Sequence, residues 1–217
     1  MVKKSSGMDF NSAIKRPFQD VTKLVIGCAL NIVPIVNFLS MGYVLKSGGM
    51  TLKGNNKLPE WQDWGKLFVT GLLSVIIALI WMIPALVLFA IGGGAAFASM
   101  MTAGATGGLS LGGLAGAGVL FAIGGLLALI AAYFLPAAIL GYVKNDKFGN
   151  AFDFSTVFKK ALNGNYFVAW ILSVVVGIVL GIIGGIIPYV SIVLSPAASF
   201  ISAMIGITLI GSVYKNL

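Results

Sequence analysis

Three long stretches of the chain contain no ionisable side chain apart from Cys28 and tyrosines, and they constrain the fold more than any other feature. The stretches are residues 24–45, 67–143 and 167–213. A helix needs about 20 apolar residues to cross the hydrocarbon core of a bilayer. The second stretch can therefore hold two spans with a connector, and the third can hold two spans with a tight turn. In the hydrocarbon core no water is present to bind backbone N–H and C=O groups, so these groups must form hydrogen bonds with each other. An apolar stretch satisfies them within itself as an α-helix, so the sequence predicts helices in all three stretches.

The composition agrees with lipid as the solvent of this chain. Of its 217 residues, 59% are hydrophobic and 9% are charged, whereas a soluble domain carries about 25% charged residues. The chain has no histidine and one cysteine, Cys28. This argues against zinc sites, histidine-based acid–base pairs and a disulfide framework. We therefore expect a protein that is not an enzyme and has no catalytic residue, cofactor or metal.

The basic residues lie only between and beside the apolar stretches. The four segments that hold all of them contain Lys3, Lys4, Lys15, Arg16 and Lys23; Lys46, Lys53, Lys57 and Lys66; Lys144, Lys147, Lys159 and Lys160; and Lys215. The positive-inside rule places such segments in the cytoplasm. Each apolar stretch would then enter the membrane and return, leaving both termini cytoplasmic in a multi-pass protein of the cell membrane. The net charge of +8 follows from this rule, so we expect no nucleic acid partner.

The first stretch, residues 24–45, is too short to cross the membrane twice. Two helical arms on either side of Pro34 would each rise only about 15 Å, half the thickness of the hydrocarbon core. The sequence favours a re-entrant hairpin broken around Pro34, with the amides of Asn31 and Asn37 beside the break. The alternative is a single kinked span, which would place the lysines that follow it outside the cell.

A short pattern precedes each apolar stretch and suggests an internal repeat. The three copies are DFNSAIKRP from Asp9, DWGKLFVTG from Asp63 and DFSTVFKKA from Asp153. In each copy the Asp precedes an aromatic residue, and a large apolar residue follows four positions after that aromatic. The Asp residues are placed to cap helix N-termini. The apolar spacing predicts an amphipathic helix that lies in the plane of the headgroups.

The predicted fold is an all-α integral membrane protein in a single domain, residues 1–217, with three repeats and about four full transmembrane helices. Each repeat consists of an interfacial amphipathic helix followed by a membrane hairpin. The repeats cover residues 9–45, 61–143 and 151–215. The second contains a Gly/Ala-rich connector, 92–118, which the sequence leaves open as a compact external loop or a helical extension.

The candidate site residues are those expected at the membrane surface. Basic side chains predicted to bind lipid headgroups are Lys15, Arg16, Lys23, Lys66, Lys159 and Lys160. Aromatic residues predicted to anchor the chain at the interface are Trp61, Trp64, Tyr43 and Tyr142. Asn31 and Asn37 either satisfy the broken backbone or contact a ligand in the re-entrant loop.

One segment also resembles a known family. The sequence LPEWQDWGKLFVTG at 58–71, together with RPFQD at 16–20 and Gly42-Tyr43, is similar to a prokaryotic, mainly archaeal, membrane family known as domain of unknown function 4013. The resemblance covers most of the chain, and the connector 92–118 looks like a variable insertion. It implies a polytopic membrane protein and carries over no functional residues, because the family has no established activity.

Two functions are compatible with these features. The first is a non-enzymatic membrane component that organises the membrane, binds lipids with anionic headgroups, or assembles as a homo-oligomer or with a membrane-protein partner. The alternative is a passive channel or facilitator for a small neutral solute, lined in part by Asn31 and Asn37. The absence of charged side chains from the apolar stretches argues against ion- or proton-coupled transport.

Overall fold

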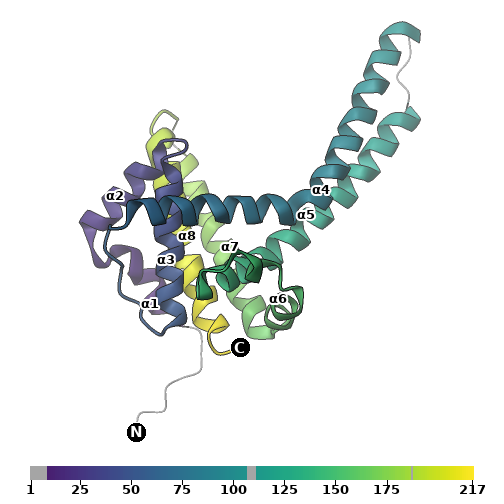
Figure 1. Ribbon diagram of the computed structural model, residues 1–217. Coiled ribbons are helices and arrows are strands. Elements are labelled where there is room, and N and C mark those ends of the chain that lie inside the picture. Colours follow the sequence, from purple (N-terminus) through teal and green to yellow (C-terminus); the bar gives the residue numbers. More distant parts are fainter. Residues whose placement is uncertain (1–8, 107–110, 187) are drawn as a thin grey trace. The chain divides into compact units, whose positions relative to one another are not determined.

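The computed structural model describes residues 9–106, 111–186 and 188–217, and the regular elements in these ranges are all helical (Figure 1). The all-α prediction is therefore confirmed for them. The helices are α1 (Phe10–Lys15), η1 (Arg16–Gln19), α2 (Val21–Ile32), α3 (Asn37–Leu52), α4 (Trp64–Thr106), α5 (Leu111–Asn145), η2 (Phe148–Phe152), α6 (Phe154–Ala161), α7 (Gly164–Gly185) and α8 (Ser191–Tyr214).

The chain divides into two compact units. Unit 1 comprises the chain up to Val75 and then Pro136–Leu217, and unit 2 is Ile76–Leu135. Both α4 and α5 pass from one unit into the other.

Four of the described helices, α4, α5, α7 and α8, are long and apolar enough to cross a membrane. The number of full spans predicted from the sequence is confirmed in this sense. These helices expose large apolar side chains, such as Ile178 and Ile182 of α7, as expected where lipid is the solvent. The connector 92–118 is a helical extension in its described parts, because α4 continues to Thr106 and α5 begins at Leu111.

The first apolar stretch forms a helical hairpin. Pro34 lies in the turn between α2 and α3, where Ile35 adopts a left-handed backbone with φ of 72°. The two arms pack together, and the Ser40 hydroxyl of α3 donates a hydrogen bond of 2.9 Å to the Gly27 carbonyl of α2. The stretch is therefore a pair of packed helices joined by a turn, and not one continuous helix. The second arm is longer than expected, since α3 continues to Leu52.

The first and third repeats have the predicted order of a short helix followed by a helical hairpin, and the second does not. Trp64 directly opens the long helix α4. The prediction of a separate interfacial helix there is therefore wrong. In the other two repeats the chain restarts: Asp20 accepts a hydrogen bond from Lys23 N and caps α2, and Asn163 caps α7 by accepting one from Asn165 N. After Trp64 the apolar sequence continues without such a cap.

Helix α8 is the centre of unit 1. Every residue of its 204–214 segment is buried, and it packs against α7, α3, α2 and α1. Glycines on α2 and α3 make room for its side chains, because Phe200 lies against Gly27 and Ile207 against Gly48. Such close approach of small residues stabilises helix packing in lipid, where the hydrophobic effect between helices is absent.

Helices α3 and α4 cross with their backbones in direct contact. A Cβ atom built on Gly42 would lie 1.9 Å from the Leu67 carbonyl oxygen, and one built on Gly71 would lie 2.0 Å from the Phe38 carbonyl oxygen. Neither position could hold a side chain without a shift of backbone. The two glycines therefore set the distance between α3 and the first turns of α4.

Unit 2 is a pair of helical segments from α4 and α5. Two of its glycines face the partner segment: a Cβ on Gly124 would meet the ring of Phe89 at 2.8 Å, and one on Gly92 would meet Leu120 Cβ at 3.2 Å. The rings of Phe89 and Phe121 stack with centroids 6.0 Å apart. Gly92 and Gly124 thus serve helix pairing, whereas a Cβ at Gly93, Gly94, Gly116 or Gly125 would meet nothing within 4 Å.

Candidate lipid-contacting surface

Helix α6 presents an exposed apolar stripe beside a buried one. Phe154, Phe158 and Leu162 recur every fourth residue and are exposed, Leu162 to 73%. Val157 and Ala161, one position before Phe158 and Leu162, are buried against the rest of unit 1. A soluble protein would place polar residues on that exposed face. The arrangement is typical of a helix that lies at a membrane surface with its apolar side toward lipid.

Helix α1, with the following turn η1, repeats this arrangement. Phe10, Ile14 and Phe18 are exposed at the same spacing, and Ala13 and Pro17 are buried. Both short helices lie at the end of unit 1 where α8 finishes (Figure 1). We call α1 and α6 the surface helices.

Aspartates cap both surface helices, as predicted. The Asp9 carboxylate accepts a hydrogen bond of 3.0 Å from Ser12 N, and that of Asp153 accepts bonds from the N–H and hydroxyl of Thr156. Hydrogen bonds from Ser12 and Thr156 lower the pKa of the two carboxyls. Asp63, the third predicted cap, directly precedes α4, and its carbonyl accepts from Leu67 N.

The lysines predicted to bind headgroups differ in how freely they can do so. Lys15 and Lys159 are exposed on the surface helices, and neither has an ion-pair partner among the described residues. Lys160 donates a hydrogen bond of 3.2 Å to the Tyr214 carbonyl and lies 3.9 Å from that residue's ring centroid. Burial, and then the charge of Lys144, lower the pKa of Lys160.

Two further predicted headgroup lysines are already paired with carboxylates. Lys23 lies 2.6 Å from Glu60 and 3.7 Å from Asp20, and its side chain is 15% exposed. Lys66 lies 2.7 Å from Asp146, and both side chains are exposed. Lys23 is thus mainly a structural cation, whereas Lys66 could exchange its carboxylate for another anion.

Arg16 is not a headgroup ligand, which corrects the prediction. Its side chain is fully buried, and the guanidinium donates to the hydroxyls of Thr51 and Thr208 and to the carbonyls of Ser47 and Lys57. Burial lowers the pKa of Arg16 to about 10, so the group remains charged near neutral pH.

The sequence did carry a signal for the burial of Arg16. Ala13, Arg16 and Pro17 are spaced as one face of a helix, and this face points to the core. The neighbouring residue Lys15 falls on the outer side. The spacing relative to Ala13, rather than the charge, separates the two basic residues.

The aromatic anchors also divide into buried and exposed side chains. Tyr43 is 1% exposed and Tyr142 is buried, so the prediction that they anchor the interface is wrong. Tyr43 stacks on Trp61 with ring centroids 3.9 Å apart, and Trp61 stacks on Trp64 at 5.6 Å. The stack ends at Trp64, which is exposed and remains able to reach the interface.

Hydrogen bonds fix the ordering of this aromatic stack. The Tyr43 hydroxyl donates to the Pro59 carbonyl at 3.0 Å, and the Trp61 indole N–H donates to the Lys23 carbonyl at 3.3 Å. The Leu-Pro-Glu-Trp segment, residues 58–61, is thereby tied to α2 and α3. These contacts give this segment of the sequence a structural role.

The two asparagines beside the first hairpin's turn have different surroundings. Asn31 donates a hydrogen bond of 2.8 Å to the Pro196 carbonyl of α8, which supports its reading as a partner for backbone groups. The side-chain oxygen of Asn37 is buried and has no hydrogen-bond partner among the residues the structure describes.

A pocket of about 270 Å³ opens between α3, the first turns of α4 and the end of α5, all within unit 1. Its charged lining residues are Lys46, Lys53, Lys66, Asp63 and Asp146. We call it the lysine pocket. Sequence reasoning did not single out Lys46 and Lys53.

The signal for this pocket was the spacing along α3. Gly42, Lys46, Gly49 and Lys53 recur at intervals of four, three and four residues, which places them on one helix face. That face alternates the smallest side chain with a long cation. The face of α3 that lines the pocket can therefore be predicted from the sequence, but the helices that pack against it cannot.

Together these features define a helical membrane protein with four membrane-length helices and apolar surface helices beside them. A family model described as "Protein of unknown function (DUF4013)" matches residues 26–189. The chain belongs to this family, which confirms the resemblance seen in its sequence. No curated protein and no solved structure matches the chain.

Proposed function

We propose that this protein is a non-enzymatic, membrane-organising component that lies partly in the headgroup layer of one leaflet and binds anionic lipids there. The observation that carries the proposal is the pair of Asp-capped surface helices with exposed apolar stripes, Phe10/Ile14/Phe18 and Phe154/Phe158/Leu162. Exposed Lys15 and Lys159 adjoin these stripes.

Surface helices that insert into one leaflet increase the area of that leaflet. An amphipathic surface helix buries its apolar face about 5–10 Å into the headgroup and acyl boundary. Each lysine close to an anionic membrane surface contributes about 1 kcal/mol of attraction. Two such helices at the same end of unit 1 would expand a single leaflet and favour curvature.

The test is the diameter of vesicles that contain the full-length protein. Reconstituted at a fixed ratio into vesicles with anionic lipid, the wild type should give smaller vesicles than a protein-free preparation, as measured by electron cryomicroscopy. The variant Phe10→Ser/Phe158→Ser should lose most of this effect while keeping its helix content by circular dichroism. A wild-type diameter equal to that of protein-free vesicles would refute the proposal.

A passive path for a small neutral solute is the second candidate, and the buried, unpartnered side-chain oxygen of Asn37 is the observation in its favour. Flux of urea or glycerol into proteoliposomes should then exceed that into protein-free vesicles, and Asn37→Leu should abolish the excess. Equal flux with and without the protein would count against this function.

A further inference from the structure

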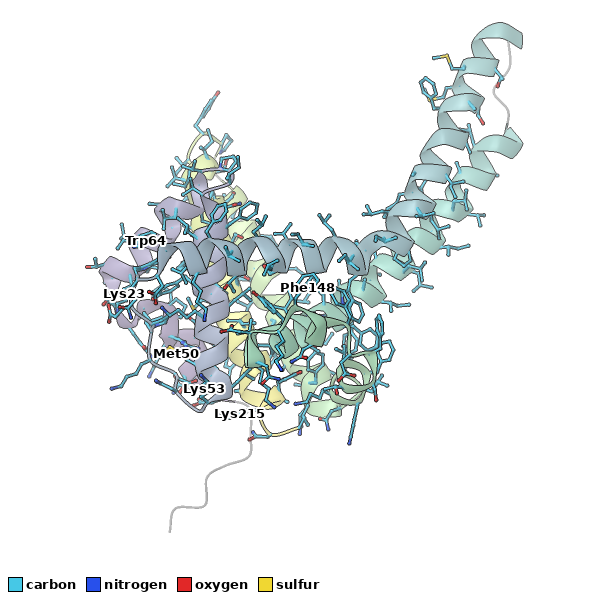
Figure 2. The ribbon with its side chains drawn as sticks, in the orientation of Figure 1. Lys23, Met50, Lys53, Trp64, Phe148 and Lys215 are labelled. Atoms are coloured by element: carbon cyan, nitrogen blue, oxygen red, sulfur yellow. The ribbon has the colours of Figure 1, made fainter. Side chains whose placement is uncertain are left out.

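The lysine pocket contains more positive charge than the protein itself neutralises. Lys66 pairs with Asp146 at 2.7 Å. Lys46 and Lys53 also line the pocket, and neither has an ion-pair partner in the described part of the chain. Lys53 lies at the end of α3 (Figure 2). Three lysines and two aspartates, Asp63 and Asp146, line the pocket, and the excess positive charge points to an anion that is not part of this chain.

The pocket lies where the uncharged stretches of the sequence begin and end. Leu67 and Val143, the first and last residues of the second apolar stretch, line it together with Met50. Its lining therefore combines apolar side chains with ammonium groups. In a membrane-embedded chain this boundary falls at the depth of the lipid headgroups.

Glycines bring the lysine-bearing face of α3 close to its neighbours. A Cβ on Gly49 would meet Val143 Cγ1 of α5 at 2.9 Å, and one on Gly42 would collide with the Leu67 carbonyl of α4. Lys46 and Lys53 therefore line the same space of about 270 Å³ as Lys66 of α4. An unstructured basic surface would not concentrate these groups in a cavity.

We propose that the lysine pocket binds the phosphate of an anionic phospholipid, with Lys46 and Lys53 holding the phosphate oxygens and the Asp63 carboxylate accepting a hydrogen bond from a headgroup hydroxyl. The inference rests on the proposed lipid-binding function and names its specific site. Asp63 lines the same pocket, and a carboxylate repels a bare phosphate but accepts from a hydroxyl. A hydroxyl-bearing headgroup such as glycerol is therefore preferred to phosphatidic acid.

The experiment compares two double variants of the full-length protein that remove the same charge from different places. Lys46→Gln/Lys53→Gln, the pocket variant, removes the two lysines that lack ion-pair partners from the pocket, and Lys57→Gln/Lys215→Gln, the control variant, removes two exposed lysines that lie outside the pocket and outside the surface helices. Native mass spectrometry of detergent-solubilised protein titrated with phosphatidylglycerol measures lipid binding. Helix content and thermal unfolding by circular dichroism identify any variant that fails to fold.

The pocket variant should bind phosphatidylglycerol about 30-fold more weakly, from about 1 kcal/mol for each lysine, and the control variant should bind it nearly as the wild type does. Wild-type protein should bind phosphatidic acid less tightly than phosphatidylglycerol. Equal weakening in both variants, or no weakening in the pocket variant, would overturn the proposal. If the pocket variant does not fold, the single variant Lys53→Gln replaces it, because Lys53 is exposed. It should also weaken phosphatidylglycerol binding, by a smaller factor, and unchanged binding would overturn the proposal.

A second arm distinguishes a lipid from a soluble phosphate compound. Glycerol 3-phosphate and inorganic phosphate are added as competitors at equal concentration to the lipid, and they should leave its binding unchanged. Displacement by either would refute the lipid assignment. The vesicle diameter of the pocket variant separates this inference from the proposed function, since the apolar stripes remain intact: a failed binding test with unchanged curvature rejects only the pocket.

Discussion

Arg16 shows how a single residue can join four parts of the chain. It follows α1, and it donates to α3 through Thr51, to α8 through Thr208, and to the loop after α3 through the Lys57 carbonyl. No carboxylate pairs with it among the described residues. Because the acceptors are neutral, the burial of the charge is offset by hydrogen bonds alone, which makes each of them important.

The first prediction concerns this guanidinium. Arg16→Ala should destabilise the protein by roughly 3 kcal/mol, since hydrogen bonds to a charged group are worth about 1.5–3 kcal/mol and the cavity adds to the loss. Lys15→Ala, one residue earlier but exposed, should change stability by less than about 0.5 kcal/mol. Thermal unfolding in detergent, followed by circular dichroism, measures both. Equal effects would show that Arg16 does not connect the elements as described.

The second prediction concerns the backbone contact between α3 and α4. Gly42→Ala places a methyl group 1.9 Å from the Leu67 carbonyl oxygen, and overpacking against backbone should cost about 3 kcal/mol. Gly65→Ala is the matched control, because its Cβ meets nothing within 4 Å and alanine is the better helix former by roughly 1 kcal/mol. The two variants should shift the unfolding temperature in opposite directions. A tolerated Gly42→Ala would mean that the helices do not cross this closely.

At the scale of single elements, the surface helices depend on their aspartate caps. The pKa of the Asp9 carboxyl is lowered from its ordinary value of 3.8 by hydrogen bonds from Ser12, and that of Asp153 by hydrogen bonds from Thr156. A carboxyl with a lower pKa in the folded state contributes stability above its unfolded pKa. That contribution is lost as the pH falls through the folded pKa.

The third prediction concerns this loss of stability at low pH. The wild type should lose stability as the pH is lowered from about 5 to about 2, and Asp9→Asn/Asp153→Asn should lose less, because asparagine keeps the acceptor oxygen but cannot be protonated in this range. Unfolding temperatures at the two pH values measure the difference. A double variant with the same pH dependence as the wild type would contradict a role for these carboxylates.

The elements were predictable from the sequence where the pattern was local. The caps at Asp9 and Asp153, the break at Pro34 and the four long helices follow from residue type and apolar length. The prediction of a separate interfacial helix in the second repeat was wrong. The motif at Trp64 is not followed by a residue that ends the helix, as happens after the other two copies.

The site was less predictable because burial depends on contacts between distant segments. Tyr43 is an aromatic residue beside a basic segment, which is where interface anchors are enriched. In the structure, however, residues 58–61 fold back and cover it. The lysine pocket likewise needs α3, α4 and α5 together. A periodic face on one helix can be seen in the sequence, but the helices that complete the site cannot be assigned from it.

At the scale of the whole molecule, the two hairpins of unit 1 point the same way. Their turns, near Ile35 and Tyr189, lie at the end away from the surface helices (Figure 1), and both residues are exposed. Lys53 and Lys215 lie toward the opposite end (Figure 2). This separation of apolar tips from cations agrees with the positive-inside expectation that the basic segments share one side of the membrane.

The fourth prediction tests that sidedness directly. In a Cys28→Ser background, single cysteines at Asn55 and Gly149 should both resist a membrane-impermeant maleimide added to intact cells, and both should react after permeabilisation. Each lies in a basic segment between apolar stretches. A cysteine at Gly112, in the uncharged connector of the second stretch, should react without permeabilisation, because the hairpin carries its connector across. If Asn55→Cys is labelled from outside while Gly149→Cys is not, α2 and α3 together cross the membrane once. The second apolar stretch would then cross the membrane an odd number of times, and Lys46, Lys53, Lys57 and Lys66 would lie outside the cell. That result would contradict the placement of all basic segments in the cytoplasm.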